Sequence, residues 1–544
     1  MKNKIWLILL LSALSLLTAQ GQEKLYVTTD RGAYIAGDRV YFSLFCIDGE
    51  GRRSDFSAVS YLELLSTDGT VAEAKAGLFG GRGAGSFLIP ASAPTGNYLL
   101  IAYTAGGKAV PEGSRLLSVY NTTTTARVKD GVTIVPQGQW SAPEATECYD
   151  GNLILSFPRN ARAGSRAKLS VNAPAGTDLA LSVSRYDGLA TPDGQSLQAF
   201  LHGEKAVPTT HSGEYEGEII VAQVEGLERS AIEQQHDRVT AFLSSAGSPS
   251  NIYIGRSDTD GQIRFFTNNI YGNRELVCEV ASMSGRSCHI SFASPFTHPE
   301  SGPLPALTLS PAQQGALEAR KAALKAESAL DLDTLVQFLP KRSDLLLAGI
   351  KPVHYHLDDY TRFPTVREIC VEFVPELQFT KKDGRWRIRM FSGDAVTSRQ
   401  YLQDNILVLM DGVVLTDHGM LEDFDAMLLE DIDIYSQPVT IGEVTYNGIV
   451  NFITKKNYVT ALHFPENVRV VDFMGVSYPV AYPGDTEPAE GRQLLYWNPA
   501  LEVPEEGCSV DICLPSDPGN FRILAEGWTP DGQPVRTEFL ISTD

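Results

Sequence analysis

The chain contains little cysteine for its length. Its 544 residues include seven cysteines, far below the density of a small disulfide-stabilised domain. The odd number leaves at least one thiol without a partner inside the chain. Two pairings stay open, one between Cys278 and Cys288 across an expected hairpin turn and one between the neighbouring Cys508 and Cys513. Cys370 falls on the apolar side of an expected helix and is interpreted as a small buried side chain.

Basic side chains are also scarce. Lys and Arg total 45 against 66 Asp and Glu, which gives a formal net charge of −21 and a pI of about 4.9. A chain of this charge is repelled by nucleic acids and by anionic lipid surfaces, so neither is expected as a primary partner. The charge favours solubility, and attraction of a basic partner is the alternative interpretation.

A long apolar run occurs only at the N-terminus. Lys2 and Lys4 precede the apolar stretch from Ile5 to Leu17, and Ala19-Gln20-Gly21 forms a small-x-small cleavage site. This order is typical of a secretory signal peptide, which we assign to residues 1–21. No cysteine stands at the cleavage site, so a lipid anchor is not predicted. No later run is long and apolar enough for a membrane-spanning helix, and we expect an exported mature chain that is soluble or peripherally held.

The motifs of common enzymes are missing as well. The sequence has no serine nucleophile elbow, no phosphate-binding glycine loop and no His-Glu-x-x-His zinc motif. Its carboxylates show no spacing typical of glycoside hydrolysis. We therefore predict a protein that is not an enzyme and has no catalytic, cofactor-binding or metal-binding residues.

What the chain does contain is a succession of short alternating strands. Its length, with 43% apolar and 20% charged residues, suits three to five globular domains. Alternation between Gly, Pro and Asp turn signals predicts four antiparallel sandwiches, at residues 22–125, 126–196, 197–300 and 461–544. Residues 301–362 are predicted to be a helical connector, in which Ser310 caps a helix rich in Ala, Leu, Lys and Glu. We expect this helix to pack against the protein.

A mixed α+β pattern fills residues 363–460. Thr365 to Glu368 forms a capping box, and Pro375 ends the helix that follows. Ile406 to Met410 is a predicted strand that ends at the Asp411-Gly412 turn, and further strands are expected from Ile432 and from Ile449. Between them, residues 420–429 have the spacing of a helix. The expected fold class is mainly β and multidomain, with one α+β domain.

Two stretches of the first sandwich resemble a known family. Residues 26–42 are YVTTDRGAYIAGDRVYF, and residues 85–104 are GSFLIPASAPTGNYLLIAYT. A loop motif followed by this closing motif resembles the second macroglobulin domain of α2-macroglobulin-like proteins. The resemblance raises a protease trap or a thioester protein as the function. No cysteine begins a Cys-x-Glu-Gln sequence and the chain is far shorter than a full trap, so we set that function aside.

The α+β stretch resembles the plug domain of TonB-dependent outer-membrane receptors. The sequences LVLMDGVVL, DIDIY and YNGIVNFITKK at residues 407–415, 431–435 and 446–456 carry the resemblance. A receptor continues into a barrel of many strands, whereas fewer than 90 residues follow Lys456 and do not look like membrane strands. Residues 355–377 resemble the entry helix of plug-like domains that accompany macroglobulin domains in exported proteins of Gram-negative bacteria. Residues 461–544 resemble the C-terminal immunoglobulin-like domain of the same architecture.

These resemblances imply a non-enzymatic binding or scaffold protein of the cell envelope. It would lie in the periplasm or at the outer membrane of a Gram-negative bacterium, as an accessory to a TonB-dependent type of transport system. The expected partner is a protein, either an outer-membrane barrel or a TonB-linked component, and no cofactor is expected. The alternatives are a macroglobulin-like protease inhibitor, a hydrolase with a site built from distant loops, and a surface adhesin that binds glycans or peptides.

One short segment has the composition of a metal site. His354-Tyr355-His356-Leu357-Asp358-Asp359 holds four side chains that bind metals, and in a strand His354 and His356 would share a face. The alternative, which we favour, is a packed segment whose carboxylates pair with Arg362 or Arg367.

Three other polar groups are interpreted as structural. Asp258-Thr259-Asp260-Gly261 begins like a calcium loop but lacks the remaining ligands, so a turn is expected. The plug positions Asp411, Gly412 and Gly448 are interpreted as turn formers. An acidic run is interpreted as a solvated helix face and consists of Asp423, Asp425, Glu430, Asp431 and Asp433.

Overall fold

The computed structural model describes residues 23–543, except for 144–146, 159–160, 192–195, 204–212, 226–238, 247–250, 269, 282–288, 330–335, 338–349, 393–399, 403–404, 423, 457–463, 465 and 485–491. The assigned signal peptide, Cys288 and Asp423 therefore lie outside the described residues. The chain is mainly β and multidomain, with 52% of its residues in strands and 10% in helices, which confirms the predicted fold class.

The first sandwich is one eight-stranded sheet that folds over its own core. Its order is β1-β3-β6-β5-β4-β7-β8-β2, and the short β2 runs parallel to β8. Alternate side chains such as Phe42, Leu64 and Leu100 point inward and are fully buried, as the period of a strand requires. The strands are β1 (Lys24–Thr29), β2 (Ala33–Ile35), β3 (Arg39–Ile47), β4 (Val59–Ser66), β5 (Gly69–Phe79), β6 (Arg82–Leu88), β7 (Gly96–Tyr103) and β8 (Arg115–Tyr120).

The second sandwich combines two segments that are far apart in the sequence. One segment supplies β10 (Ile154–Ser156), β11 (Arg166–Asn172) and β12 (Thr177–Arg185), and the other supplies β33 (Leu494–Val503), β34 (Cys508–Cys513), β35 (Gly519–Trp528) and β36 (Pro534–Thr543). Their sheets have the orders β10-β11-β34 and β33-β12-β35-β36. The sequence pattern predicts separate sandwiches for these segments, at 126–196 and 461–544. Each segment alone has too few strands to cover a core, so they share one.

This arrangement also separates Cys508 from Cys513. They occupy the two ends of β34, five positions apart. A strand rises about 3.3 Å per residue, so their Cα atoms are much farther apart than a disulfide allows. The two cysteines therefore do not pair with each other.

The third sandwich is interrupted in the same way. One sheet contains β13 (Ile219–Glu225), β16 (Gln262–Phe266) and β18 (His289–Phe292). The other has the order β15-β14-β17-β31, from β14 (Thr240–Ser245), β15 (Ile252–Arg256), β17 (Arg274–Ala281) and β31 (Val468–Phe473). Because β31 follows the α+β unit in the chain, that unit is an insertion into the third sandwich. The third sandwich and its insertion together interrupt the second.

The α+β unit, residues 353–454, is called the head below. Its five-stranded mixed sheet has the order β21-β27-β30-β25-β26, with β25 parallel to β30. A three-stranded sheet β22-β23-β24 and the hairpin β28-β29 accompany it. The elements are β21 (Val353–His356), α5 (Val366–Glu372), β22 (Leu377–Lys382), β23 (Arg385–Ser392), β24 (Gln400–Leu402), β25 (Ile406–Met410), β26 (Val413–Val414), β27 (Leu429–Tyr435), β28 (Val439–Ile441), β29 (Val444–Tyr446) and β30 (Gly448–Thr454).

The local sequence pattern predicted α5 correctly, but it failed further along the head. Thr365 and Glu368 form the expected capping box, and the helix buries Val366, Ile369 and Cys370. The helix predicted over residues 420–429 is wrong. The chain instead forms two short 3₁₀ turns, at His418–Leu421 and Ala426–Leu428. The Asp425 side chain accepts a hydrogen bond from the Met427 N–H and thereby starts a second turn where a continuous helix would have run.

The predicted connector helix packs against the first sandwich. Ser310 and Gln313 form a capping box around the turn Pro311–Gln313, which leads into α4 (Gln314–Ala329). Leu317 and Leu324 pack against β2. The preceding strand β19 (Leu307–Leu309) pairs in parallel with β9 (Val132–Ile134). The chain therefore returns along the first sandwich before it crosses to the head.

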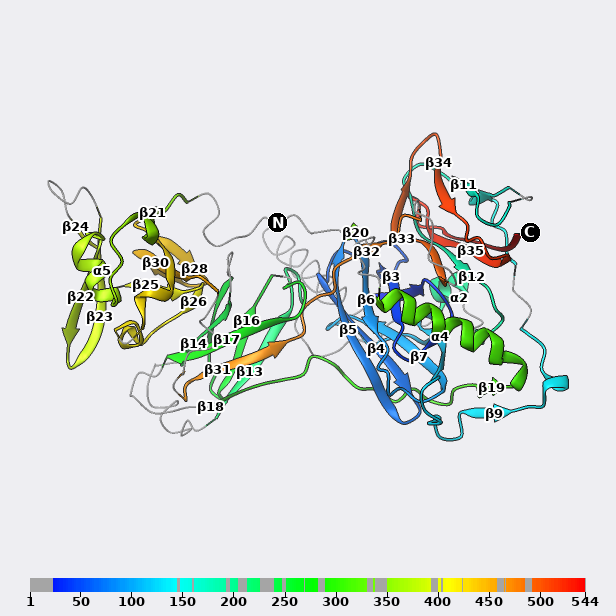
Figure 1. Ribbon diagram of the computed structural model, residues 1–544, viewed down its shortest axis with the longest axis horizontal. Helices are drawn as coiled ribbons and strands as arrows, with labels where there is room; N and C mark the ends of the chain where they lie inside the picture. The colour runs from blue at the N-terminus through cyan, green and yellow to red at the C-terminus, as the bar shows by residue number, and fades with distance from the viewer. Residues whose placement is uncertain are drawn as a thin grey trace, which may run out of the picture.

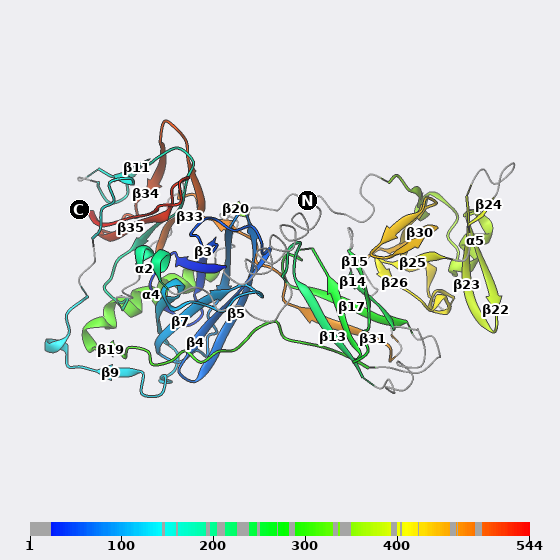
Figure 2. The same ribbon diagram turned by 180° about the vertical axis from the view of Figure 1, so that it is seen from behind.

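The molecule is elongated, and the head lies at one end of it. The third sandwich occupies the middle, and the first and second sandwiches lie side by side at the other end with α4 across them (Figure 1, Figure 2). We call the first two sandwiches with α4 the base. Trp528 of the second sandwich packs at ring-centroid distances of 5.8 Å from Tyr26 and 4.5 Å from Phe45 of the first. Phe200 of the short helix α2 (Leu197–His202) closes this junction.

Candidate functional site

The histidines of the predicted metal segment do share a face. In the antiparallel pair β21–β27, His354 lies opposite Asp433 and His356 opposite Asp431. Each Nδ1 is 2.7 Å from its carboxylate, and this hydrogen bond to Asp431 raises the pKa of His356. The partners therefore come from the acidic run, which is partly strand and not a helix face. These cross-strand pairs hold the edge strand β21 in register.

Arg362 pairs with one carboxylate of the predicted metal segment and also binds the backbone. Its Nε lies 3.6 Å from Asp358, and one guanidinium nitrogen donates to the backbone carbonyl of Leu429. It therefore ties the segment before α5 to the start of β27.

The predicted turn residues have distinct structural tasks. Asp258 accepts backbone hydrogen bonds from Asp260 and Gln262, which builds a turn. Asp411 and Gly412 have positive φ values of 47° and 78° in the turn after β25, where a glycine is least strained. Gly448 is not a turn former. A Cβ there would lie 2.4 Å from the Met390 sulfur, so close packing requires the glycine.

One cluster that the sequence analysis missed joins the first sandwich to the chain after β18. Ligand atoms of Glu63, Glu73 and His298 lie within 4.8 Å of one another, a spacing that suits a cation. The buried Glu63 carboxylate already accepts hydrogen bonds from the Tyr103 hydroxyl and from the backbone N–H groups of Thr297 and His298. We therefore assign this cluster to holding the two segments together.

An arginine-lined cavity of about 470 Å³ lies inside the base, where the first two sandwiches meet α4. Its arginines are Arg31, Arg115, Arg185, Arg320, Arg522 and Arg536. Each of these arginines lies within 3.3 Å of a carboxylate. The pairs are Arg31–Asp30, Arg115–Glu526, Arg185–Asp517, Arg320–Asp187 and Arg522–Glu538, and Arg536 contacts both Glu526 and Glu538. Asp38, 3.8 Å from Arg31, is a sixth carboxylate beside these six arginines, so the positive charges of the cavity are balanced locally.

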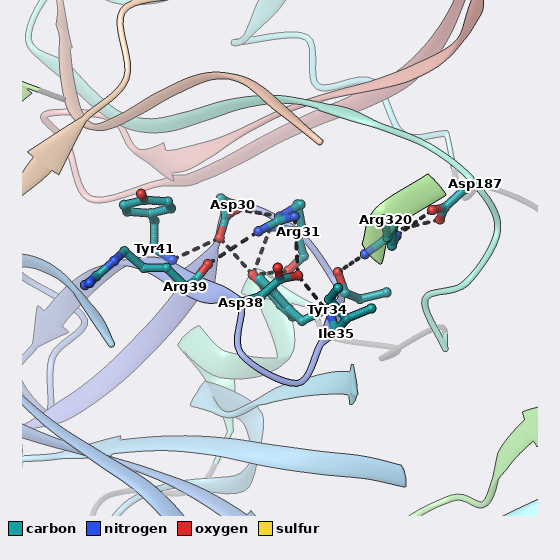
Figure 3. Close-up of polar contacts among 10 residues, drawn as sticks. Asp30, Arg31, Tyr34, Ile35, Asp38, Arg39, Tyr41, Asp187 and Arg320 are labelled. Atoms are coloured by element: carbon teal, nitrogen blue, oxygen red, sulfur yellow. Dashed lines mark hydrogen bonds and ion pairs between the residues drawn. The ribbon is translucent and has the colours of Figure 1, made fainter. Parts of the chain in front are cut away.

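Figure 3 shows the hydrogen bonds and ion pairs that join the elements around part of this cavity. Buried Asp30 accepts hydrogen bonds from the Tyr34 hydroxyl at 2.8 Å and from Arg31 Nε at 2.9 Å. Arg320 of α4 forms a bidentate pair with Asp187 of the second sandwich, at 2.6 and 2.9 Å, and also donates to the Ala33 carbonyl. The loop motif of the first sandwich thus builds the place where three units are joined. Since its charges are paired, we assign the cavity to structure.

A second arginine-rich site lies in the head and has a different charge balance. A groove of about 690 Å³ separates the β22–β23 hairpin from the five-stranded sheet and the third sandwich. Its cations are Lys382, Arg385, Arg387 and Arg389. Within the described part of the chain, none of these four forms an ion pair with a carboxylate, and Arg389 lies 5.3 Å from the Tyr401 ring centroid. Asp383 also lines this head groove, so four cations face one carboxylate there and the groove keeps a net positive charge.

The register of the hairpin places the cations on one wall. Arg385, Arg387 and Arg389 alternate along β23 with Trp386 and with the buried Ile388 and Met390. Lys382 lies opposite Arg385 on β22 and shares its face. The other wall comes from β25, β26, β29 and the third sandwich. Its apolar lining side chains, Leu407, Val414, Tyr446 and Phe242, are 2–7% exposed.

His418 at this groove is neutral at physiological pH. Its Nδ1 accepts the Ile388 N–H at 2.9 Å. Burial, aided by the charge of Arg387, lowers its pKa to about 4. The positive charge of the groove therefore comes from the arginines and the lysine.

The comparisons with known proteins give structural likeness only. No protein-family model matches the chain, and no curated protein matches it. In its β domains the chain is structurally similar to bacterial α2-macroglobulins. Native α2-macroglobulin of Escherichia coli and Salmonella α2-macroglobulin reacted with methylamine each show 10% identity and a TM-score of 0.25 over 96% of this chain and 40% of theirs. The chain thus spans about 40% of the length of these proteins.

An adhesin is also among the similar structures. FdeC of Escherichia coli shows 13% identity and a TM-score of 0.15 over 48% of this chain and 60% of that one. None of the described helices is long and apolar enough to cross a membrane.

A local signal for the head groove was present in the sequence. QFTKKDGRWRIRMF, at residues 378–391, contains five cations and one acid in a chain of net charge −21. Alternation of arginine with Trp, Ile and Met indicates one cationic and one inward face in a strand. The apolar wall across the groove comes from remote segments, so no local pattern indicates it.

The head is attached to the third sandwich next to this groove. The backbone N–H of Thr416 donates to Glu279 of β17 at 3.1 Å, and the Thr416 hydroxyl donates to the same carboxylate. The Val414 N–H donates to the Ser244 hydroxyl at 3.4 Å. Burial raises the pKa of Glu279 to about 7, although the hydrogen bonds from Thr416 lower it.

Glu279→Gln is expected to remove a pH dependence of stability. The folded state raises the pKa from 4.5 to about 7, so it favours the protonated carboxyl. The protonated Glu279 carboxyl contributes fully to the free energy of unfolding below pH 4.5. This contribution, about 3 kcal/mol in all, is lost as the pH rises through about 7. In urea unfolding, the free energy of unfolding of the variant should be higher than that of the wild type at pH 8 and equal to it near pH 4.5. Glu275→Gln, on an exposed position of the same strand, should leave the pH profile unchanged.

Proposed function

We propose that the chain is an exported, non-enzymatic binding protein of the cell envelope, and that its head groove binds an anionic partner protein. One contrast carries this proposal. In the base cavity every arginine has a carboxylate partner, whereas the four cations of the head groove have none among the described residues. Balanced charges hold a fold together, and unbalanced charges beside an apolar wall are available to a partner.

The rest of the molecule reinforces the attraction at this one place. The chain has a net charge of −21, so an anionic partner is repelled elsewhere and guided to the groove. A groove between two units, with apolar lining and a few charged groups, is where proteins commonly bind ligands. The base, with its paired charges and aromatic junction, serves as a support for the head.

Two forms of this function differ in where the partner resides. The resemblance of residues 363–460 to receptor plugs favours an accessory of an outer-membrane transport system, with a partner in the same envelope. The adhesin form, favoured by the elongated shape with the groove at one end, has a partner outside the cell. Both require the unpaired cations of the head.

Affinity capture with matched variants tests the proposal. The tagged mature chain is incubated with detergent-solubilised envelopes of the native cell, beside Arg385→Gln/Arg387→Gln and Arg166→Gln/Lys168→Gln. Arg166 and Lys168 occupy alternate exposed positions of β11 and match the head pair in spacing. A partner retained by the wild type and the β11 variant and lost from the head variant supports the envelope form. A partner retained equally by all three chains contradicts the groove as the binding site.

A further inference from the structure

We infer that the head groove binds an extended segment of a partner protein in which acidic and apolar residues alternate. This inference rests on the proposed function and specifies the chemistry of the partner at the same groove. It follows from the spacing of the cations, from the apolar wall opposite them and from the direction in which the cations run.

The cations have the spacing of an extended peptide. Arg385, Arg387 and Arg389 stand two positions apart on β23, and side chains two apart on a strand are separated by about 6.6 Å. Acidic residues at alternate positions of an extended segment have the same separation. Each carboxylate of such a segment can therefore meet one guanidinium, and arginine binds carboxylates with directed hydrogen bonds.

The opposite wall accounts for the other half of the segment. Leu407, Val414 and Tyr446 belong to one buried apolar cluster with Phe242 of the third sandwich, and all four line the groove. In an extended segment, residues between the acidic ones point to the opposite side. An alternating segment thus places its carboxylates on the cationic wall and its apolar side chains on the apolar wall.

The direction of the cations favours a protein segment over a lipid. An anionic lipid carries its charge at one end of an apolar chain. The arginines instead follow one another along β23 over four residue steps, about 13 Å. A polyphosphate has charge along its length but no apolar side for the opposite wall. Only a segment with charge on one side and apolar groups on the other matches both walls.

Fluorescence anisotropy with the full mature chain tests the inference. The probes are three labelled decapeptides: one alternates Glu and Val, one alternates Glu and Ser, and one has the composition of the first with all Glu before all Val. We expect the Glu-Val alternating peptide to bind about tenfold or more tightly than either control. Arg385→Gln/Arg387→Gln should weaken it by about tenfold or more, and Arg166→Gln/Lys168→Gln should not.

Three results would overturn the inference. Equal binding of the alternating and block peptides excludes the two-walled extended mode, and equal binding to the head variant places the peptide elsewhere. Phosphatidylglycerol vesicles or polyphosphate that displace the alternating peptide more effectively than the unlabelled peptide does would assign the groove to another anion. If the peptides fail while a captured partner still depends on Arg385 and Arg387, the proposed function stands and this inference is wrong.

Discussion

Glu526→Ala is expected to lower the free energy of unfolding by about 3–5 kcal/mol, because it removes a buried carboxylate that two arginines share. The Glu526 side chain is completely buried. It lies 3.3 Å from Arg115 of the first sandwich and 3.0 Å from Arg536 of the second, and it accepts a hydrogen bond from the Tyr26 hydroxyl at 3.2 Å. The substitution leaves excess positive charge in the buried part of the base.

Urea unfolding of the protein, followed by circular dichroism, measures this effect. Glu502→Ala is the matched control, because Glu502 is exposed on β33 in the same sheet, and its effect should stay within about 0.5 kcal/mol. Equal midpoints for Glu526→Ala and the wild type would show that the shared carboxylate adds nothing to the base. Glu526→Gln should be milder, since it keeps an acceptor for Tyr26.

Trp528→Ala is expected to destabilise the base by about 3–5 kcal/mol and to loosen the contact between its two sandwiches. The indole is 2% exposed and packs against Tyr26, Phe45 and Phe200. Its removal leaves a cavity lined by rings from three separate elements, and strands held at both ends by a β-ladder cannot close around it. Limited proteolysis should then cut between the first and second sandwiches earlier than in the wild type.

Trp386→Ala provides the comparison within the same residue type. Trp386 lies on the β22–β23 hairpin, where Lys381 and Arg367 approach its ring to 5.1 and 5.5 Å. Because this indole is only partly covered, its loss should cost about 1 kcal/mol and leave the base intact. A Trp528→Ala chain that unfolds like the wild type would mean that the aromatic junction does not hold the base together.

The strands and turns near each motif could be predicted because their causes are local. The capping box at Thr365 is satisfied by residues three positions away, and the left-handed turn at Asp411-Gly412 depends on two adjacent residues. The loop from Asp30 to Asp38 likewise closes on itself through Arg31 and Tyr34. Such features depend on contacts within a few residues, which a sequence displays directly.

The choice of strand partners could not be predicted. Alternation tells which side of β12 faces the core, but it does not tell that β33 and β35, more than 300 residues later, flank it. The same holds for β31, which completes the third sandwich after the head has been inserted. A sheet edge accepts any strand of suitable pattern, so long-range pairing is decided by which segments together close a core.

The candidate site also has features that the local sequence determines and features that long-range contacts determine. By itself, the sequence determined the mainly β, multidomain class and the cationic alternation of residues 385–389, because composition and a period of two are properties of neighbouring residues. Only the tertiary structure decided that the arginines of the base are paired and those of the head are not. Arg115, Arg185 and Arg320 meet carboxylates that lie more than 100 residues away in the sequence, at Glu526, Asp517 and Asp187. It also brought Phe242 and Leu407 across from β23 to form the apolar wall, which no local pattern contains.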